Sequence, residues 1–544
     1  MPASKNQNYL HGAAILAIAT IVTKILGAIY KIPLGNILGD EGFAHFNVAY
    51  NLYNVLLALS TAGLPIAVAR LISESNNLKK PAQINRIYKI AVITFVTLGM
   101  IGSLIMFLFP VDLATRMGDA EASQGILAMA PAVLLVCICS AFRGYTEGLS
   151  DMRPTSVSQV IEVLFKVISG LTIVILLQRQ GYDLPILSAG AICGTGIGAL
   201  FASIYLGFVV RKRRKYELAL VESAPENYDM SSDTSGVIFK KFVNIGVPIA
   251  LGSCVLSVVS LINQTLIFDR LQNAAGCTFA EAKTLFGVYS KALTLYNLPA
   301  AIITPMTISV IPAITGFLAR KQYEDARNVV ESSLRISTII ALPMAIGLSV
   351  CAQPIMDGLY YGSAAEGPQL LAIMGLASYF VSLALMTTAI LQAGGRERLP
   401  MYTMLTGCAL DVLLFWLLVG NPDIHIFGGP IATLLCYILM SGLNLWFVMH
   451  RLPEKPNLAK VFVLPVINCA VMGAAVRVAY PAFMKLLGAG DDPGRKLILA
   501  GLLLTILVGI AVYLVMTILT RAVTMEDMKL IPKGEAIGKK LHIR

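Results

Sequence analysis

The chain has 544 residues, of which 56% are hydrophobic and only 13% are charged. A soluble globular domain carries about 25% charged residues, so this composition excludes that class and indicates an integral membrane protein. The formal net charge of +11 would suit a nucleic-acid-binding protein, but most basic residues lie between apolar runs. That pattern orients membrane proteins, and we therefore expect no nucleic-acid partner.

Apolar runs long enough to cross a bilayer follow one another along the chain. About 20 helical residues span the hydrocarbon core, so the sequence predicts an all-α integral membrane protein with fourteen transmembrane helices. Their ranges are 10–33, 45–72, 88–110, 124–147, 155–178, 184–210, 240–268, 286–314, 333–353, 367–392, 400–420, 426–449, 460–482 and 496–520. The nine cysteines lie mostly inside these runs without a CxxC pair, so we interpret them as small core residues and not as a disulfide or metal framework.

The connecting loops alternate between many and few basic residues. The rich loops contain Lys79, Lys80, Arg86, Lys89, Arg143, Arg153, Arg211 to Lys215, Lys240, Lys241, Arg320, Lys321, Arg327, Arg335, Arg396, Arg398, Arg451, Lys455 and Lys460. By the positive-inside rule these loops are cytoplasmic, so both termini are expected in the cytoplasm.

A polar stretch at 211–241 predicts a cytoplasmic linker between two halves of the chain. We expect an N-terminal lobe of six helices (1–210), a C-terminal lobe of six helices (242–450), two further helices (451–520) and a cytoplasmic tail (521–544).

The two predicted lobes repeat with an offset of 246 residues. Three pairs share this offset: Tyr50-Asn51-Leu52 with Tyr296-Asn297-Leu298, Lys89 with Arg335, and Pro154 with Pro400. Six predicted helices separate the copies, so the repeat is parallel, about a pseudo-two-fold axis along the membrane normal. Transporters built in this way bind their substrate between the lobes.

Several basic residues lie inside predicted helices: Lys24, Lys31, Arg70, Lys166, Lys291 and Arg477. A lysine at mid-membrane costs roughly 2.5–3.5 kcal/mol unless it faces a polar cavity or a partner. Lys31, Arg70 and Arg477 lie near enough to a helix end to extend their charge to the interface. Lys24 and Lys291 would bind a diphosphate if they converge, with Lys31, Arg70 and Lys166 as secondary ligands.

Two acidic residues are also embedded. Glu162 precedes Lys166 by four residues on one helix face, so the two can pair internally as an alternative to a functional role. Asp411 is either a ligand for a coupling cation, Na⁺ or H⁺, or a buried polar contact, and Glu162 is the other candidate for such coupling. No P-loop, HExxH or GxSxG motif and no metal-ligand spacing of histidines is present. We therefore expect neither enzyme activity nor a cofactor.

A further pattern begins at Arg143, with RGYTEG at 143–148, MRPT at 152–155 and SQVIE at 158–162. It resembles the signature of the polysaccharide biosynthesis/stage V sporulation protein B family of the multidrug/oligosaccharidyl-lipid/polysaccharide (MOP) flippase superfamily, which includes the lipid II flippases. The signature residues are Arg143, Gly144, Gly148, Pro154, Ser158 and Gln159, supported by Lys24-Ile25-Leu26-Gly27 and Leu391-Gln392-Ala393-Gly394-Gly395-Arg396.

The resemblance implies two lobes around a central cavity and flipping of an undecaprenyl-diphosphate-linked saccharide, above all a peptidoglycan precursor, across the bacterial cytoplasmic membrane. It implies membrane lipids and the cell-wall synthesis machinery as further partners. Lys24 stands where lipid II flippases carry a first-helix arginine, and Lys291 lies near the place of their helix 8 arginine. In contrast, Tyr30-Lys31 replaces their arginine–aspartate pair, and their helix 2 arginine is absent.

Two other functions stay open. A multidrug or organic-cation antiporter of the same MATE-like fold would need acidic cavity residues, whereas embedded lysines outnumber carboxylates in this chain. A non-transporting scaffold for envelope synthesis would use the cytoplasmic linker or tail for its interactions. The glycan, the coupling ion and a role in growth or sporulation are left open.

Overall fold

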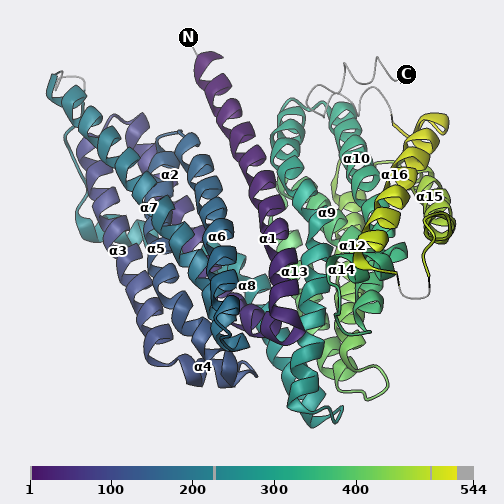
Figure 1. The fold of residues 1–544 in the computed structure, drawn as a ribbon. Helices are drawn as coiled ribbons and strands as arrows, with labels where there is room; N and C mark the ends of the chain where they lie inside the picture. The colour runs from purple at the N-terminus through teal and green to yellow at the C-terminus, as the bar shows by residue number, and fades with distance from the viewer. Residues whose placement is uncertain (1–2, 224–227, 491–492, 524–544) are drawn as a thin grey trace. The chain divides into compact units, whose positions relative to one another are not determined.

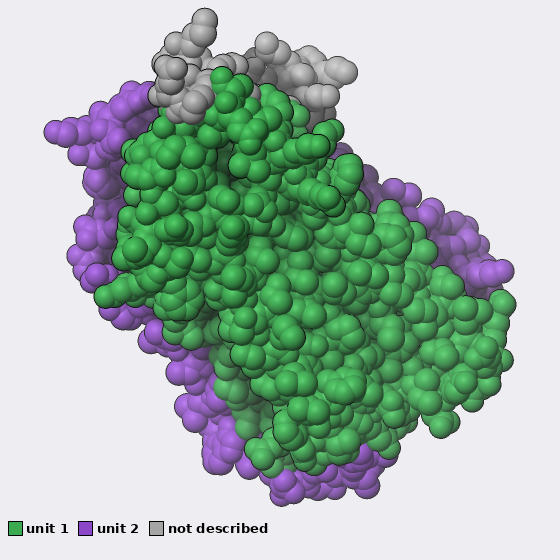
Figure 2. All heavy atoms as spheres, turned by 90° about the vertical axis from the view of Figure 1, so that its left-hand side faces the viewer, with its two compact units in different colours: residues 1–269 green, residues 270–544 purple. Residues whose placement is uncertain are grey.

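The computed structural model describes residues 3–223, 228–490 and 493–523 (Figure 1). Every regular element within these ranges is helical, and 13 helices are long and apolar enough to cross a membrane. The predicted all-α membrane class is thereby confirmed. The chain divides into two compact units, Met1–Asp269 and Arg270–Arg544, here called unit 1 and unit 2 (Figure 2).

The described residues of unit 1 form ten helical elements, in which α6 and α5 pack along α7 and α3 packs along α5. The elements are α1 (Ala3–Ala58), η1 (Leu59–Gly63), α2 (Leu64–Asn77), α3 (Pro81–Leu108), α4 (Pro110–Arg116), η2 (Ala120–Ala122), α5 (Ser123–Gly148), α6 (Arg153–Arg179), α7 (Leu184–Ser223) and nearly all of α8 (Ser235–Asn273).

Unit 2 contains the remaining described helices, in which α12 packs against α9, α10 and α14. They are α9 (Phe279–Ala319), α10 (Tyr323–Val350), α11 (Ala352–Leu359), α12 (Gly367–Ala393), α13 (Arg398–Val419), η4 (His425–Phe427), α14 (Gly428–Arg451), α15 (Leu458–Leu486) and α16 (Arg495–Leu519).

The helix α1 covers the first predicted run and the start of the second. It breaks at Gly39, whose φ of 67° and ψ of −164° are conformations that glycine adopts without a steric penalty. A Cβ added there would meet nothing within 4 Å, so the backbone conformation and not packing requires this glycine. The predicted number of fourteen helices stays a prediction, because 13 candidates are present among the described residues.

The predicted linker is largely helical. α7 continues through the RKRRK run to Ser223, and α8 starts at Ser235. The division between the two units lies after Asp269, not within 211–241. The lobe boundaries given above stay predictions, and residues 524–544 of the predicted tail lie outside the described residues.

Individual close contacts join α8 to the other helices of unit 1. Asn51 of α1 donates a hydrogen bond of 2.8 Å to Gln264 of α8. A Cβ added to Gly63 would overlap the backbone of Ala250. Such close approach of backbones is a usual device for packing helices in membranes.

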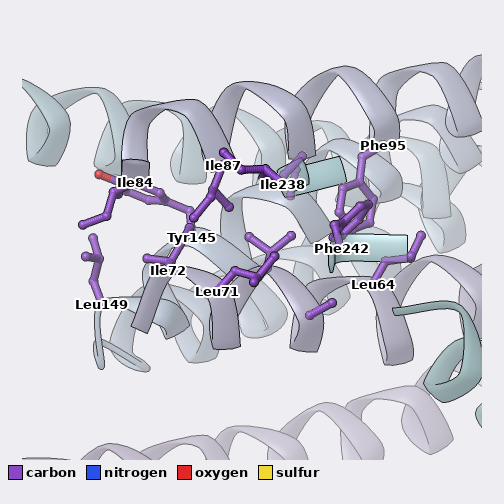
Figure 3. Close-up of a cluster of buried hydrophobic side chains, with 14 of the residues drawn as sticks. Leu64, Leu71, Ile72, Ile84, Ile87, Phe95, Tyr145, Leu149, Ile238 and Phe242 are labelled. Atoms are coloured by element: carbon purple, nitrogen blue, oxygen red, sulfur yellow. The ribbon is translucent and has the colours of Figure 1, made fainter. Parts of the chain in front are cut away.

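Apolar side chains of α2, α3, α5 and α8 form one core of unit 1 (Figure 3). Leu71 and Ile72 of α2 pack with Ile87 of α3, while the rings of Phe95 and Phe242 lie 6.4 Å apart. In lipid the drive for this packing is van der Waals contact and not the removal of water, so close fit matters more than apolar area.

Two glycines of α5 bring this helix against α2. A Cβ on Gly144 would lie 3.0 Å from the carbonyl oxygen of Pro65, and one on Gly148 would lie 2.7 Å from the Cβ of Ile72. The two helices can therefore pack this closely only with glycine at both positions.

We expect Gly148→Ala to lower the free energy of unfolding by about 1–3 kcal/mol, and with it the melting temperature, because the new methyl group overpacks the contact with α2. Gly207→Ala on α7 is the matched control, since its Cβ would meet Phe142 at an ordinary 3.6 Å and alanine favours a helix. Thermal unfolding in detergent, followed by circular dichroism, measures both. Equal melting temperatures for the two variants would contradict the packing argument.

Candidate functional site

The predicted diphosphate ligands are distributed over both units. Lys24 on α1 and Arg70 on α2 are exposed, while Lys31 on α1 and Lys166 on α6 are half-buried. Lys291 on α9 belongs to unit 2 and is only 2% exposed. Convergence of Lys24 and Lys291 stays a prediction, because the two residues lie in different units. Lys31 and Lys166, by contrast, come together within unit 1.

Lys31 and Lys166 meet at the ring of Tyr50 on α1. The Nζ atoms of Lys31 and Lys166 lie 5.3 and 4.3 Å from the centroid of this ring. Lys166 also donates a hydrogen bond of 2.9 Å to the Tyr50 hydroxyl, and its Nζ lies 5.6 Å from the ring centroid of Tyr30. We call Tyr30, Lys31, Tyr50 and Lys166 the lysine–tyrosine cluster.

The two rings of the cluster are held in place by their surroundings. The Tyr30 hydroxyl donates a hydrogen bond of 2.9 Å to the carbonyl oxygen of Ala191, and Gly170 leaves room for it, since a Cβ there would lie 2.5 Å from that hydroxyl. Phe46 stacks on Tyr50 with centroids 5.4 Å apart. The lysines therefore rest on a rigid aromatic surface.

The electrostatics of the cluster favour an anion. The ammonium groups of Lys31 and Lys166 repel each other, and among the described residues neither is paired with a carboxylate. Cation–π contacts offset part of the cost of burying such charges. An anion between the two ammonium groups would remove their repulsion, so the site is chemically suited to bind a phosphate or diphosphate.

Glu162 does not form the internal pair with Lys166 that the sequence spacing allows. Its carboxylate accepts a hydrogen bond of 2.7 Å from Arg143, whose Nε donates to the Ser158 hydroxyl at 3.0 Å. The Arg143 and Glu162 side chains are 12% and 18% exposed. The guanidinium forms two bonds in a fixed geometry, which a lysine amine four residues away cannot match.

The family signature is thus a packing device between helices. Arg143 and Ser158 join α5 to α6, and Pro154 lies in the first turn of α6, where the lack of an amide hydrogen costs nothing. Gly144 and Gly148 form the contact with α2 described above. Gln159 is half-buried.

Asp411 on α13 is a buried acid of unit 2, with 6% of its surface exposed. Tyr289 and Tyr296 of α9 and Tyr437 of α14 lie within electrostatic range of its carboxylate. A buried carboxylate can hold a proton or a hard cation.

The environment of Lys291 is different. Its ammonium group donates a hydrogen bond of 3.4 Å to Ser363 and lies 5.4 Å from the ring centroid of Tyr360. This lysine is therefore contained within the core of unit 2.

Sequence reasoning named Tyr30 and Tyr50 without assigning them a role at the site. An aromatic series on α1 could have shown it, since Phe43, Phe46, Tyr50 and Tyr53 follow one another at three- and four-residue spacing. Their rings form consecutive pairs with centroids 5.4–5.9 Å apart. Such spacing puts the rings on one helix face, where a cation can rest on them.

Comparison with known proteins gives two family matches. The model described as polysaccharide biosynthesis protein matches residues 9–318, and the MatE model matches residues 283–417. The first match covers more than half of the chain.

Curated relatives from Bacillus subtilis (strain 168) match over most of their length. The uncharacterized membrane protein YabM is 27% identical, covering 98% of this chain and 96% of YabM. The stage V sporulation protein B is 24% identical, covering 97% and 98%. The lipid II flippase MurJ is 24% identical, covering 86% and 88%.

Two solved structures share the fold. The lipid II flippase MurJ in its inward closed conformation has a TM-score of 0.66 at 15% identity, covering 93% of this chain and 98% of that one. An inward-facing multidrug resistance MATE family transporter of the MOP superfamily has a TM-score of 0.65 at 16% identity, covering 80% and 98%. Those relatives named by function are flippases or transporters and not enzymes. The chain therefore belongs to the polysaccharide biosynthesis protein family, as a multi-pass membrane protein with the fold of the MOP-superfamily transporters.

Proposed function

We propose that this MOP-superfamily transporter moves an undecaprenyl-diphosphate-linked saccharide across the bacterial cytoplasmic membrane by alternating access. The cargo is lipid II or another cell-wall polysaccharide unit. The observation that carries the proposal is the lysine–tyrosine cluster, in which two half-buried ammonium groups share one tyrosine and lack a carboxylate partner. The relatives named stage V sporulation protein B and lipid II flippase support this class of cargo.

Lys31 and Lys166 are the first candidates to bind the diphosphate. At an effective dielectric constant of about 20, two unit charges 4 Å apart attract each other by about 4 kcal/mol. Compact ammonium groups suit the clustered charge of a diphosphate, and the Tyr50 hydroxyl already binds one of them. Lys24 and Lys291, the first candidates from the sequence, now come second together with Arg70, since Lys24 and Arg70 are exposed and Lys291 is enclosed in unit 2.

The proposal also includes the orientation and the partners of the protein. Both termini lie in the cytoplasm by the positive-inside rule. The prenyl chain of the cargo remains in the lipid while the diphosphate and saccharide pass through the protein. Membrane lipids and the cell-wall synthesis machinery are its further partners.

We further propose Asp411 as the site of a coupling cation, Na⁺ or H⁺. Its burial, within electrostatic range of three tyrosines, supports this role. Glu162 is less suited because Arg143 already engages its charge. A cation can drive transport only if it binds the inward and outward states with different affinity.

A multidrug or organic-cation antiporter is the second candidate function. Asp411 is the observation that favours it, since a buried carboxylate can bind an organic cation as well as a metal ion. The charge of the lysine–tyrosine cluster opposes it, because two ammonium groups repel a cation.

We expect the protein in detergent to bind lipid II in native mass spectrometry, and Lys31→Ala and Lys166→Ala each to weaken binding about tenfold. Tenfold is about 1.4 kcal/mol, a modest share of the attraction between an ammonium group and a phosphate. The double variant should lose at least a hundredfold. Lys215→Ala is the matched control, since Lys215 is an exposed lysine on α7.

Each outcome of this experiment separates the candidate functions. Wild-type affinity in the double variant, with an unchanged melting temperature, would refute the diphosphate site. Binding of organic cations without lipid II would favour the antiporter, and binding of neither would favour a scaffold for envelope synthesis.

Asp411→Asn should abolish the dependence of transport on a Na⁺ or H⁺ gradient in proteoliposomes, because the amide cannot supply the negative charge that binds the cation. Binding of lipid II in detergent should stay within about twofold of wild type, since the lysine–tyrosine cluster is unchanged. Asp423→Asn is the control, as Asp423 is exposed in the turn after α13. Gradient-dependent transport in Asp411→Asn would argue against the coupling role.

A further inference from the structure

A second polar group lies in unit 1, outside the lysine–tyrosine cluster. Glu41 and His45 follow the break at Gly39 and are four residues apart, so they share one face of the helix. Asp119 and Glu121 lie at η2, directly after α4, and α4 lies at the end of unit 1 opposite the N-terminus of α1 (Figure 1). The group thus joins the turn after Gly39 to the connection between α4 and α5.

His45 is held in a defined orientation. It is 1% exposed, and its Nδ1 lies 2.5 Å from the Oδ2 of Asp119, which is completely buried. The other carboxylate oxygen of Asp119 accepts a hydrogen bond of 3.2 Å from the backbone amide of Glu121. Donation of the Nδ1 hydrogen to Asp119 leaves the lone pair of Nε2 directed to the opposite side of the ring.

The Nε2 atom of His45 faces the two glutamates. It makes no hydrogen bond although it is buried, and it lies 3.4 Å from the Oε2 of Glu121. One ligand atom from each of Glu41, His45 and Glu121 lies within 4.8 Å of the other two. Glu121 is 50% exposed, so the group is open to ions from solution.

These distances suit a bound metal ion. Ligands of a tetrahedral zinc site, at about 2.0–2.1 Å from the metal, lie about 3.4 Å from one another. The distance from Nε2 to Glu121 already has this value, and a small movement of the half-buried Glu41 side chain would bring in its carboxylate. A carboxylate bound to the far nitrogen of the histidine is the usual support for a metal-ligating imidazole.

We propose that Glu41, His45 and Glu121 bind one divalent transition-metal cation of the Zn²⁺ type, with Asp119 as the positioning residue. One imidazole and two carboxylates favour such a cation over Mg²⁺ or Ca²⁺, which prefer all-oxygen sites. Water completes the coordination. The cation links the start of the second part of α1 to η2 and so stabilises this end of unit 1, independently of the proposed transport function.

The test uses full-length protein in detergent, purified without a polyhistidine tag and treated with EDTA. Isothermal titration with Zn²⁺ should give one saturable site per chain. Glu121→Gln should weaken this site at least tenfold, whereas Asp112→Asn, an exposed carboxylate on the neighbouring α4, should leave it unchanged. Glu121→Gln is expected to fold, because the side chain is half exposed and the change is isosteric.

Co²⁺ provides a spectroscopic measure of the same site. It should give the visible absorption of a four-coordinate nitrogen and oxygen site, which His45→Gln should abolish and Asp119→Asn should shift. If His45→Gln does not fold, the Zn²⁺ affinity of Glu121→Gln alone tests the proposal. No one-to-one Zn²⁺ binding in the wild type, or equal affinity in Glu121→Gln and Asp112→Asn, would overturn the proposal and leave His45 as the centre of an ion-pair network.

Discussion

The structure depends on one constraint, which is that charges within a low-dielectric helix bundle need partners. Arg143 and Glu162 are each other's partners of opposite charge, and their ion pair joins α5 to α6. Lys31 and Lys166 lack such a partner among the described residues, because both contact Tyr50 and repel each other. The charges of Arg143 and Glu162 balance without a ligand, so this pair belongs to the scaffold. The charges of Lys31 and Lys166 do not balance, and an anionic cargo would supply the missing negative charge.

The two predicted lobes carry opposite charges at adjacent positions of the sequence repeat. With an offset of 246, Tyr296 corresponds to Tyr50, and Asp411 corresponds to position 165, next to Lys166. In unit 1 an ammonium group donates a hydrogen bond to Tyr50, whereas in unit 2 a carboxylate lies within electrostatic range of Tyr296. This difference agrees with the proposed anion site in unit 1 and the proposed cation site in unit 2.

The break at Gly39 has consequences beyond the direction of α1. Because only glycine adopts its backbone conformation without strain, the helix restarts at a defined position and presents His45 to Asp119. The repeat offset relates His45 to Lys291, which is also enclosed and contacts a residue after α11. In both units, therefore, a buried basic side chain lies five residues before the repeated tyrosine.

The sequence by itself determined the membrane class, the positions of nearly all helices and the family, because hydropathy and the signature at 143–162 are local properties of the chain. Only the tertiary structure decided the partners of the embedded charges. Glu162 lies four residues from Lys166 but binds Arg143, and Lys166 binds Tyr50, 116 residues away. The group around His45 likewise brings α1 together with residues that lie 74 or more positions later in the chain. Helical spacing shows which side chains share a face of one helix, whereas a buried charge selects its partner from whichever helices pack against that face.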